Sequence, residues 1–337
     1  MKMRKCIVAF SVILALAVAA TAGSEVKKMS KKAAKLMTKA ETAIRENNHD
    51  QAIGLLQQII PLEPHSAKAH YYLGVLLYQG GKFDESISHI EETLHLQEDY
   101  PNARMLLRKV LFDAGMDAHK KQEFAKSNGY LLKVKDFPNA HVGKENENIL
   151  ALTHFHLGFN FFNLKQYPQA QAHFELCLSL EGFAKENLDL YANTLYFLGM
   201  IGYIKEQFQD SISFFKKYLA LYSGMEKKPQ LNPHANYFIG ANLFRMLESK
   251  VTRGDMSGIM ESTREIIPYL ESAIAEKLPS EDPHVMLGNC YVYRNEVDKA
   301  IQTYQDLIAA FPQSPQLENY KVFLHELQKN RPKGKKK

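Results

Sequence analysis

A glycine followed twelve residues later by a small residue recurs five times along this chain of 337 residues. In each copy a leucine or an alanine stands directly before the glycine. The five pairs are Gly74/Ser86, Gly115/Ser127, Gly158/Ala170, Gly199/Ser211 and Gly288/Ala300. Such self-similarity predicts stacked copies of one supersecondary unit, each in contact with its neighbours only. We therefore expect function to lie on an extended surface rather than in a single pocket.

The segment around Gly158 indicates what one copy looks like. Apolar residues between positions 154 and 161 follow the 3.6-residue period of a helix, and the polar stretch 164–168 interrupts them. A second amphipathic stretch carries Ala170 and Phe174 on one face. The pattern predicts an antiparallel helix pair, in which the absent side chain of Gly158 lets the second helix approach closely.

The last copy shows the most complete pattern, at His284, Leu287, Gly288, Tyr291, Ala300, Tyr304, Leu307 and Pro312. This pattern resembles the tetratricopeptide repeat, in which aromatic residues, a Leu-Gly pair, an alanine and a closing proline have fixed places. The resemblance implies an all-α, right-handed superhelical solenoid over residues 23–328, with about seven helix pairs and a C-terminal capping helix. The repeats are expected near residues 33–66, 67–100, 101–138, 145–182, 187–222, 233–276 and 281–313, and the cap at 315–328.

The spacing departs from the usual repeat in two ways. Three steps between copies are 29 residues long, against 22 at either end of the chain, and run from Ser86 to Gly115, from Ala170 to Gly199 and from Ser211 to Gly240. Seven extra residues are about two helical turns, so we expect longer helices in the middle repeats. In the sixth repeat the turn-rich segment 252–258 indicates an insertion, after which the second helix is expected to restart near Ile266.

The first 22 residues have the pattern of a secretory signal peptide. Basic residues up to Lys5 precede an apolar run of fifteen residues, and the small residues Ala20 and Ala22 fit a cleavage site. We expect cleavage after Ala22 and a secreted or periplasmic protein without a transmembrane span. The alternative is an uncleaved membrane anchor, for which the apolar run is short.

The positive charge of the chain is concentrated at its ends. Outside the signal segment and the tail 329–337, 33 basic residues stand against 37 acidic residues, a net charge of −4. This balance argues against a nucleic-acid-binding face. The tail is expected to be disordered. Together with the lysine-rich segment 27–35, it either is simply solvated or makes weak contact with an anionic surface.

In the family that this chain resembles, certain positions of each first helix line the concave face. Carried over to this chain, the resemblance places aromatic residues at Tyr71, Tyr78, Phe112, Phe155, Phe159, Phe162, Tyr196, Tyr203, Tyr237 and Phe244. Such a stripe predicts a groove that binds a protein or a peptide, unless the rings are buried between the helices. The alternative ligand is a carbohydrate, in a scaffold of exopolysaccharide export or envelope biogenesis. The absence of tryptophan argues against that alternative.

No combination of residues in the sequence indicates catalysis, a metal or a cofactor. Histidine stands at the aromatic position of three copies, at His70, His154 and His284, where we expect packing between helices rather than metal binding. Cys177 and Cys290 are expected to be separate buried thiols. The sequence contains no zinc-protease motif and no complete phosphate-binding loop. We therefore expect a non-enzymatic scaffold.

Overall fold

The computed structural model describes residues 29–137, 144–180, 182–183, 187–224 and 229–331. The predicted signal segment and most of the predicted basic tail lie outside these residues. Contacts between the helices divide the chain into two compact units, residues 1–103 and residues 104–337. The described part of the chain is helical and contains no β-strand, which confirms the predicted all-α repeat fold.

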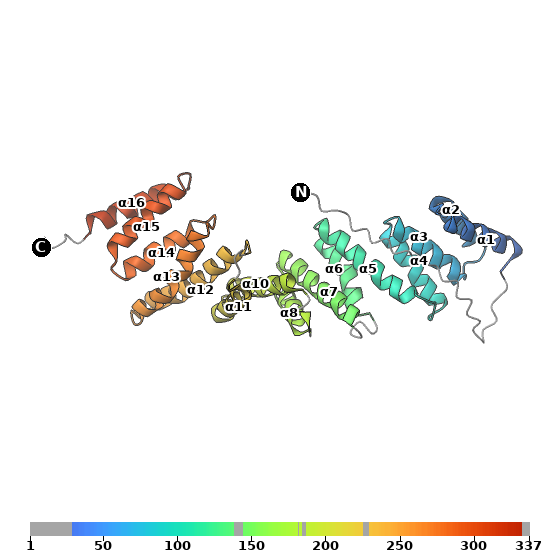
Figure 1. Ribbon diagram of the computed structural model, residues 1–337, viewed down its shortest axis with the longest axis horizontal. Helices are drawn as coiled ribbons and strands as arrows, with labels where there is room; N and C mark the ends of the chain where they lie inside the picture. The colour runs from blue at the N-terminus through green and yellow to red at the C-terminus, as the bar shows by residue number, and fades with distance from the viewer. Residues whose placement is uncertain (1–28, 138–143, 181, 184–186, 225–228, 332–337) are drawn as a thin grey trace. The chain divides into compact units, whose positions relative to one another are not determined.

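The described residues of the first unit, 29–103, form two helix pairs (Figure 1). The first pair is α1 (Lys31–Arg45) with α2 (His49–Ile59), and the second is α3 (Ala67–Gln79) with α4 (Phe83–Leu96). Polar side chains determine where three of these helices begin, because each accepts a hydrogen bond from a backbone amide of the first turn. These capping residues are Ser30, Asn48 and Ser66.

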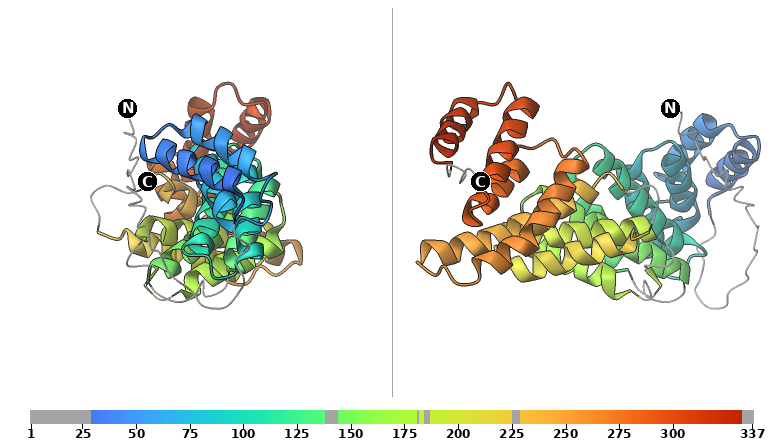
Figure 2. Two further views of the ribbon diagram at one scale, coloured as in Figure 1. Left: turned by 90° about the vertical axis from the view of Figure 1, so that its right-hand side faces the viewer. Right: turned by 60° about the vertical axis from the view of Figure 1, so that its left-hand side comes forward.

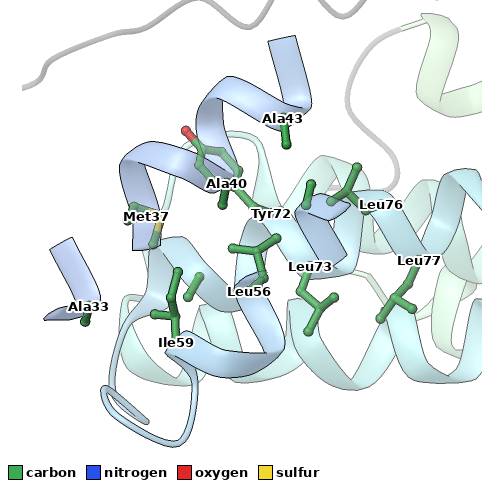
Figure 3. Packing of buried hydrophobic residues seen from close by; sticks show 12 residues of the cluster. Ala33, Met37, Ala40, Ala43, Leu56, Ile59, Tyr72, Leu73, Leu76 and Leu77 are labelled. Carbon is green, nitrogen blue, oxygen red and sulfur yellow. The ribbon is translucent and has the colours of Figure 1, made fainter. Parts of the chain in front are cut away.

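The core of the first unit lies where α1, α2 and α3 meet (Figure 3). Met37 and Ala40 of α1, Leu56 and Ile59 of α2 and Leu73 of α3 are all buried in it. The buried residues of α1 recur every three or four positions, so one face of this helix packs on both neighbours. Burying one leucine side chain in such a core contributes about 2 kcal/mol relative to leaving it exposed.

The second unit contains five helix pairs and a final helix within its described residues. The pairs are α5 (Ala103–Lys120) with α6 (Phe124–Lys135), α7 (Lys144–Asn163) with α8 (Tyr167–Ser179), α10 (Leu188–Ile204) with α11 (Phe208–Leu221), α12 (Asn232–Thr252) with α13 (Ile259–Ala275), and α14 (Asp282–Tyr293) with α15 (Val297–Ala310). The final helix, α16 (Leu317–Lys329), packs on α15 at the place predicted for the cap. Of the helices described in either unit, none has the length and apolar character needed to cross a membrane.

The same turn joins the two helices of each described pair. One residue of every turn has a positive φ, between 56° and 79°. These residues are Asn47, Gly81, Gln122, Lys165, Glu206, Gly254 and Asn295. The amide that follows each of them donates to the carbonyl five residues earlier, for example from Gln166 to Phe161 at 2.9 Å. This hydrogen bond ends the first helix and offsets the strain of a left-handed residue that carries a side chain.

The recurring glycine lets the second helix of a pair approach the first. A Cβ atom added to Gly158 would lie 2.7 Å from a ring atom of Phe174, and one added to Gly199 would lie 2.8 Å from the ring of Phe215. The residue twelve positions after the glycine faces the same contact, and Ser211 donates to the carbonyl of Gly199 at 2.7 Å. Two further serines make the equivalent hydrogen bond. The spacing of twelve residues therefore reflects a contact across the helix pair.

The first helices of three middle pairs are longer than those near the ends of the chain. α5, α7 and α10 have 18, 20 and 17 residues, against 13 in α3 and 12 in α14. This confirms the expectation of longer helices for two of the three long steps. In the third, from Ser211 to Gly240, the connection 222–231 between α11 and α12 has ten residues, against seven in the connection 60–66, so it takes up three of the seven extra residues.

The sixth pair, α12 with α13, is a long helical hairpin (Figure 2, right). Gly240 precedes the turn residue Gly254 by fourteen residues, twice the distance in the other pairs. The second helix already begins at Ile259, so the prediction that it restarts near Ile266 is wrong. The insertion is mainly helical, because each helix continues for about two more turns before the same tight turn joins them.

Cys177 and Cys290 are buried and are not bonded to each other. Burial raises the pKa of each thiol to about 12, so both are protonated at neutral pH. They are therefore packing residues, as the sequence predicts.

Candidate partner-binding face

The first helices of the second unit lie side by side. α7 contacts α10, α10 contacts α12, and α12 contacts α14. His119 of α5 lies against Phe159 of α7, with ring centroids 5.2 Å apart. We call the surface that these five helices share the first-helix face. Eight of the ten predicted aromatic residues belong to its helices, and Tyr71 and Tyr78 lie on α3 in the first unit.

Three of the ten predicted residues belong to the core. Phe155, Tyr196 and Phe244 have only 6%, 8% and 3% of their surface exposed, which corrects the expectation that they line an open groove. Phe155 and Tyr196 are buried because their rings contact the second helix of their own pair, and Phe244 lies in a core cluster with Ile266 and Leu270 of α13. Phe155 packs on Phe174 with ring centroids 6.0 Å apart, and Tyr196 packs on Phe215 at 5.5 Å.

The other seven predicted residues are half-buried, so part of each ring stays at the surface. They are Tyr71, Tyr78, Phe112, Phe159, Phe162, Tyr203 and Tyr237. Neighbouring rings hold several of them in place: Phe162 lies 5.1 Å from Phe197, and Tyr203 lies 5.0 Å from Phe238. A ring that is already held by its neighbours loses little conformational entropy when a partner covers it.

Two aromatic residues that the sequence argument did not single out, Phe197 and Phe238, join successive helix pairs. Phe197 stacks on Phe174 of the preceding pair at 5.5 Å, with the ring planes 2° apart. Phe238 stacks on Phe215 of its preceding pair at 5.3 Å and 8°. Both stand two residues before the recurring glycine, and this shared position is the sequence signal that could have identified them.

In the first unit the two predicted residues are held by separate aromatic contacts. The ring of Tyr71 lies 4.8 Å from that of Tyr100 and 6.2 Å from that of Tyr72. Burial raises the pKa of both Tyr71 and Tyr100, so their hydroxyls stay protonated. Tyr78, near the end of α3, lies 6.3 Å from Phe83 at the start of α4. Both predicted rings are therefore only partly available to a partner.

A buried polar network joins the third helix pair to the fourth. The side-chain amide of Asn160 donates to Oγ of Ser127 at 2.8 Å and to Oδ1 of Asn128 at 2.9 Å. The amide oxygen of Asn160 accepts from Nδ1 of His119 at 2.6 Å. Because Asn160 is fully buried, an unpaired polar atom here would cost free energy, and the network pairs both ends of its amide.

The three histidines at the predicted aromatic position are buried in their own helix pairs. Nδ1 of His70 lies 3.0 Å from Nδ1 of His89, and Nδ1 of His154 lies 3.0 Å from Nδ1 of His173. His284 has no such bond at Nδ1. The partner histidines were not predicted, although the same spacing of 19 residues separates both pairs in the sequence. Among the residues that the structure describes, no three potential metal ligands lie together.

An exposed cation lies on the first-helix face. The guanidinium carbon of Arg245 on α12 is 4.5 Å from the centre of the Tyr203 ring. On the same helix Tyr237 donates its hydroxyl to Asp282 of α14 at 3.1 Å. Arg245 forms no ion pair with any described carboxylate, so its N–H groups remain available to an acceptor on a partner. Arg245 directly follows Phe244 in the sequence but was not among the predicted binding residues.

The sequence pattern of the tetratricopeptide-repeat family matches residues 43–111 and again residues 285–314. These two stretches of the chain are tetratricopeptide repeats. The helix pairs between these two stretches share the same turn and the same glycine contact, which extends the repeat over the described chain. A search of curated proteins finds no significant match.

Several solved structures are similar to this chain. The C-terminal part of a repeat-containing protein from Cytophaga hutchinsonii is 15% identical over 84% of this chain and 98% of its own, with a TM-score of 0.44. YrrB, described as having an unusual peptide-binding site, is 13% identical over 79% and 97%, with a TM-score of 0.38. A chain of Naa15/Naa10 bound to HypK is 12% identical over 88% and 39%, with a TM-score of 0.48. Since these scores are below 0.5, the family assignment rests on the sequence matches and the repeat geometry.

Proposed function

We propose that this chain is a non-enzymatic scaffold that binds a protein or a peptide along its first-helix face. The observation that carries the proposal is the series of half-buried rings on successive first helices: Phe159 and Phe162 on α7, Tyr203 on α10 and Tyr237 on α12. Packing against neighbouring rings holds them, while part of each remains accessible. Such rings offer anchoring contacts for the apolar side chains of a partner.

Arg245 favours a partner that places a carboxylate beside these rings. Its guanidinium lies over Tyr203 and can still donate two parallel hydrogen bonds to an acidic group. The carboxylate of Asp282, which accepts from Tyr237, could in turn face an amide or an amine of the same partner. No described feature gives comparable support to the carbohydrate alternative.

We further propose that the protein works in the cell envelope, after export by residues 1–22 and within an assembly there. This part of the proposal rests on the signal-peptide pattern alone, and the lysine-rich ends would add weak contact with an anionic surface. The test is the mass of the chain recovered from its own cells. A chain that begins at Gly23 in an envelope fraction would support export, and an intact Met1 in the cytosol would overturn it.

Photocrosslinking in living cells tests binding at the first-helix face. A benzophenone amino acid replaces Phe162 and keeps an aromatic ring at that position. As a matched control it replaces Leu176, which is 47% exposed on the second helix of the same pair. We expect a discrete protein adduct from position 162 that is absent from position 176.

The same experiment separates the competing outcomes. Introducing Arg245→Gln should weaken the adduct at position 162 if the partner presents a carboxylate. Equal adducts from positions 162 and 176, or none from position 162, would contradict binding at this face. A polysaccharide adduct at position 162 would assign the face to the carbohydrate alternative.

A further inference from the structure

Two helix pairs, one in each unit, contain a hydrogen bond between two histidines at the same repeat positions. His70 with His89 joins α3 to α4, and His154 with His173 joins α7 to α8. In both pairs the first histidine stands four residues before the recurring glycine and the second fifteen residues after it. His70 and His154 are buried, and His89 and His173 are half-buried. The structure therefore contains two copies of one polar contact between the helices of a pair.

The protonation of the first pair follows from its neighbours. Nε2 of His70 lies 3.3 Å from the carbonyl oxygen of Pro64, which can only accept, so Nε2 carries the hydrogen. Nδ1 of a neutral His70 is then an acceptor, and His89 donates from its own Nδ1. If both rings were protonated, each Nδ1 would carry a hydrogen, the bond would be lost, and two positive charges would face each other at 3.0 Å.

We propose that the two histidine pairs are acid-sensitive contacts, which hold α3 to α4 and α7 to α8 near neutral pH and release them in acid. For the second pair the consequence, which rests on the proposed function, concerns the partner-binding face itself. Phe159 and Phe162 lie on α7, and α8 supplies Phe174 beneath this helix. Loosening α8 removes this support, so a partner bound to α7 would be released in acid.

The charged groups around the pairs make the second pair the more acid-sensitive. Burial, and then the neighbouring His70, lower the pKa of His89, while Glu85 and Glu92 on α4 raise it. Burial, and then Lys135 on α6, lower the pKa of His173 to about 4. The ring of Phe161 from α7 also stacks on His173, with ring centroids 5.4 Å apart, and adds no charge beside it.

The direction of the pH effect follows from these shifts. An unfolded histidine titrates near pH 6.5, so below this pH the opened helix pair binds more protons than the closed one. The stability that each pair contributes is therefore complete above about pH 6.5 and falls as the pH drops below that value. For the second pair the fall continues to about pH 4, the pKa of His173 in the closed pair. One extra proton bound on opening increases the opening equilibrium constant by up to about tenfold per pH unit.

Hydrogen exchange of the full chain between pH 7.5 and 5 tests the proposal without any partner, so its result is independent of the proposed function. Rates are corrected for the intrinsic pH dependence of exchange. We expect amides of α8, and more weakly those of α4, to lose protection as the pH falls. Amides of α11 are the internal control, because Leu195 and Phe214 occupy the two histidine positions of that pair. Equal pH dependence in α4, α8 and α11 would overturn the proposal.

A double variant, His154→Leu with His173→Phe, gives the fourth pair the residues of the fifth. It should reduce the pH dependence of α8 to that of α11, while an unchanged slope in the folded variant would overturn the proposal. The variant also separates the pair from His156, which faces His119 across α5 and α7 at 4.6 Å and whose pKa burial lowers to about 4. If the variant does not fold, the comparison of α8 with α11 in the unaltered chain decides.

Discussion

Two neighbouring contacts between helix pairs in the second unit use the same repeat positions, but one is hydrogen-bonded and the other is apolar. Between the third and fourth pairs, Ser127 of α6 and Asn160 of α7 are hydrogen-bonded, and we call this contact the polar seam. Between the fourth and fifth pairs, Ala170 of α8 and Ile201 of α10 occupy the same two repeat positions. There Phe174 and Phe197 stack at 5.5 Å, and we call this contact the aromatic seam.

The difference teaches that residues on the two sides of a seam are matched. Serine faces asparagine across the polar seam, and the same match recurs where Asn242 donates to Ser211 at 2.9 Å. At the aromatic seam, Ala170 stands at the position of the serine and Ile201 at that of the asparagine. Exchanging one side alone would therefore bury an unpaired polar group or leave a void. Repeats of similar backbone geometry are thus specific for their neighbours.

The largest expected effect is at the aromatic seam. Phe174 is fully buried between Gly158 and Phe197, so Phe174→Ala removes a ring from a closed site. We expect the free energy of unfolding to fall by about 4 kcal/mol, measured by urea denaturation followed through helicity. A loss below about 1 kcal/mol would show that this seam does not hold the fourth and fifth pairs together.

At the polar seam, a second substitution on the facing helix should restore part of the stability that a single substitution removes. Asn160→Ile leaves His119 and Asn128 without their partner and should cost about 2 to 3 kcal/mol in free energy of unfolding. Adding Ser127→Ala reproduces the residues of the aromatic seam and should recover about 1 kcal/mol of that loss in a double-mutant cycle. Strictly additive effects would contradict the matching of the two sides.

The recurring glycines offer a finer comparison of the two seams. Gly158→Ala places a Cβ atom 2.7 Å from the ring of Phe174, and the ring of Phe197, which stacks on Phe174, restricts its movement. Gly115→Ala places one 2.7 Å from Cδ2 of Leu131, a flexible side chain. We expect thermal melting to show a loss of about 2 kcal/mol for the first and about 1 kcal/mol for the second. The reverse order would show that the stacked ring does yield.

The sequence was sufficient to predict the helix pairs, because the residues that define each pair lie close together in the sequence. The glycine and its small partner twelve residues later meet across one turn, so spacing alone predicts the helix pair. The exposure of a ring is different: Phe155 and Phe159 lie one turn apart on α7, yet one is buried and the other half-buried. A helix in a stacked array packs on its own partner and on the next pair. Side chains of that next pair, such as Phe197, therefore set the exposure of a ring such as Phe159.

The structure of the insertion in the sixth pair also depends on neighbouring helices and could not be predicted from its own sequence. The turn-rich segment 252–258 is indeed the turn, but local composition does not tell whether added residues extend the helices or form a loop. Packing against α11 and α14 favours the helical form.

The most direct test of binding at the first-helix face is a hydrogen-exchange footprint of the protein bound to the partner captured at position 162. We expect added protection in α7, α10 and α12 around Phe162, Tyr203 and Tyr237, with little change in α8, α11 and α13 at neutral pH. Protection confined to the second helices, or to the chain ends, would contradict binding at the first-helix face.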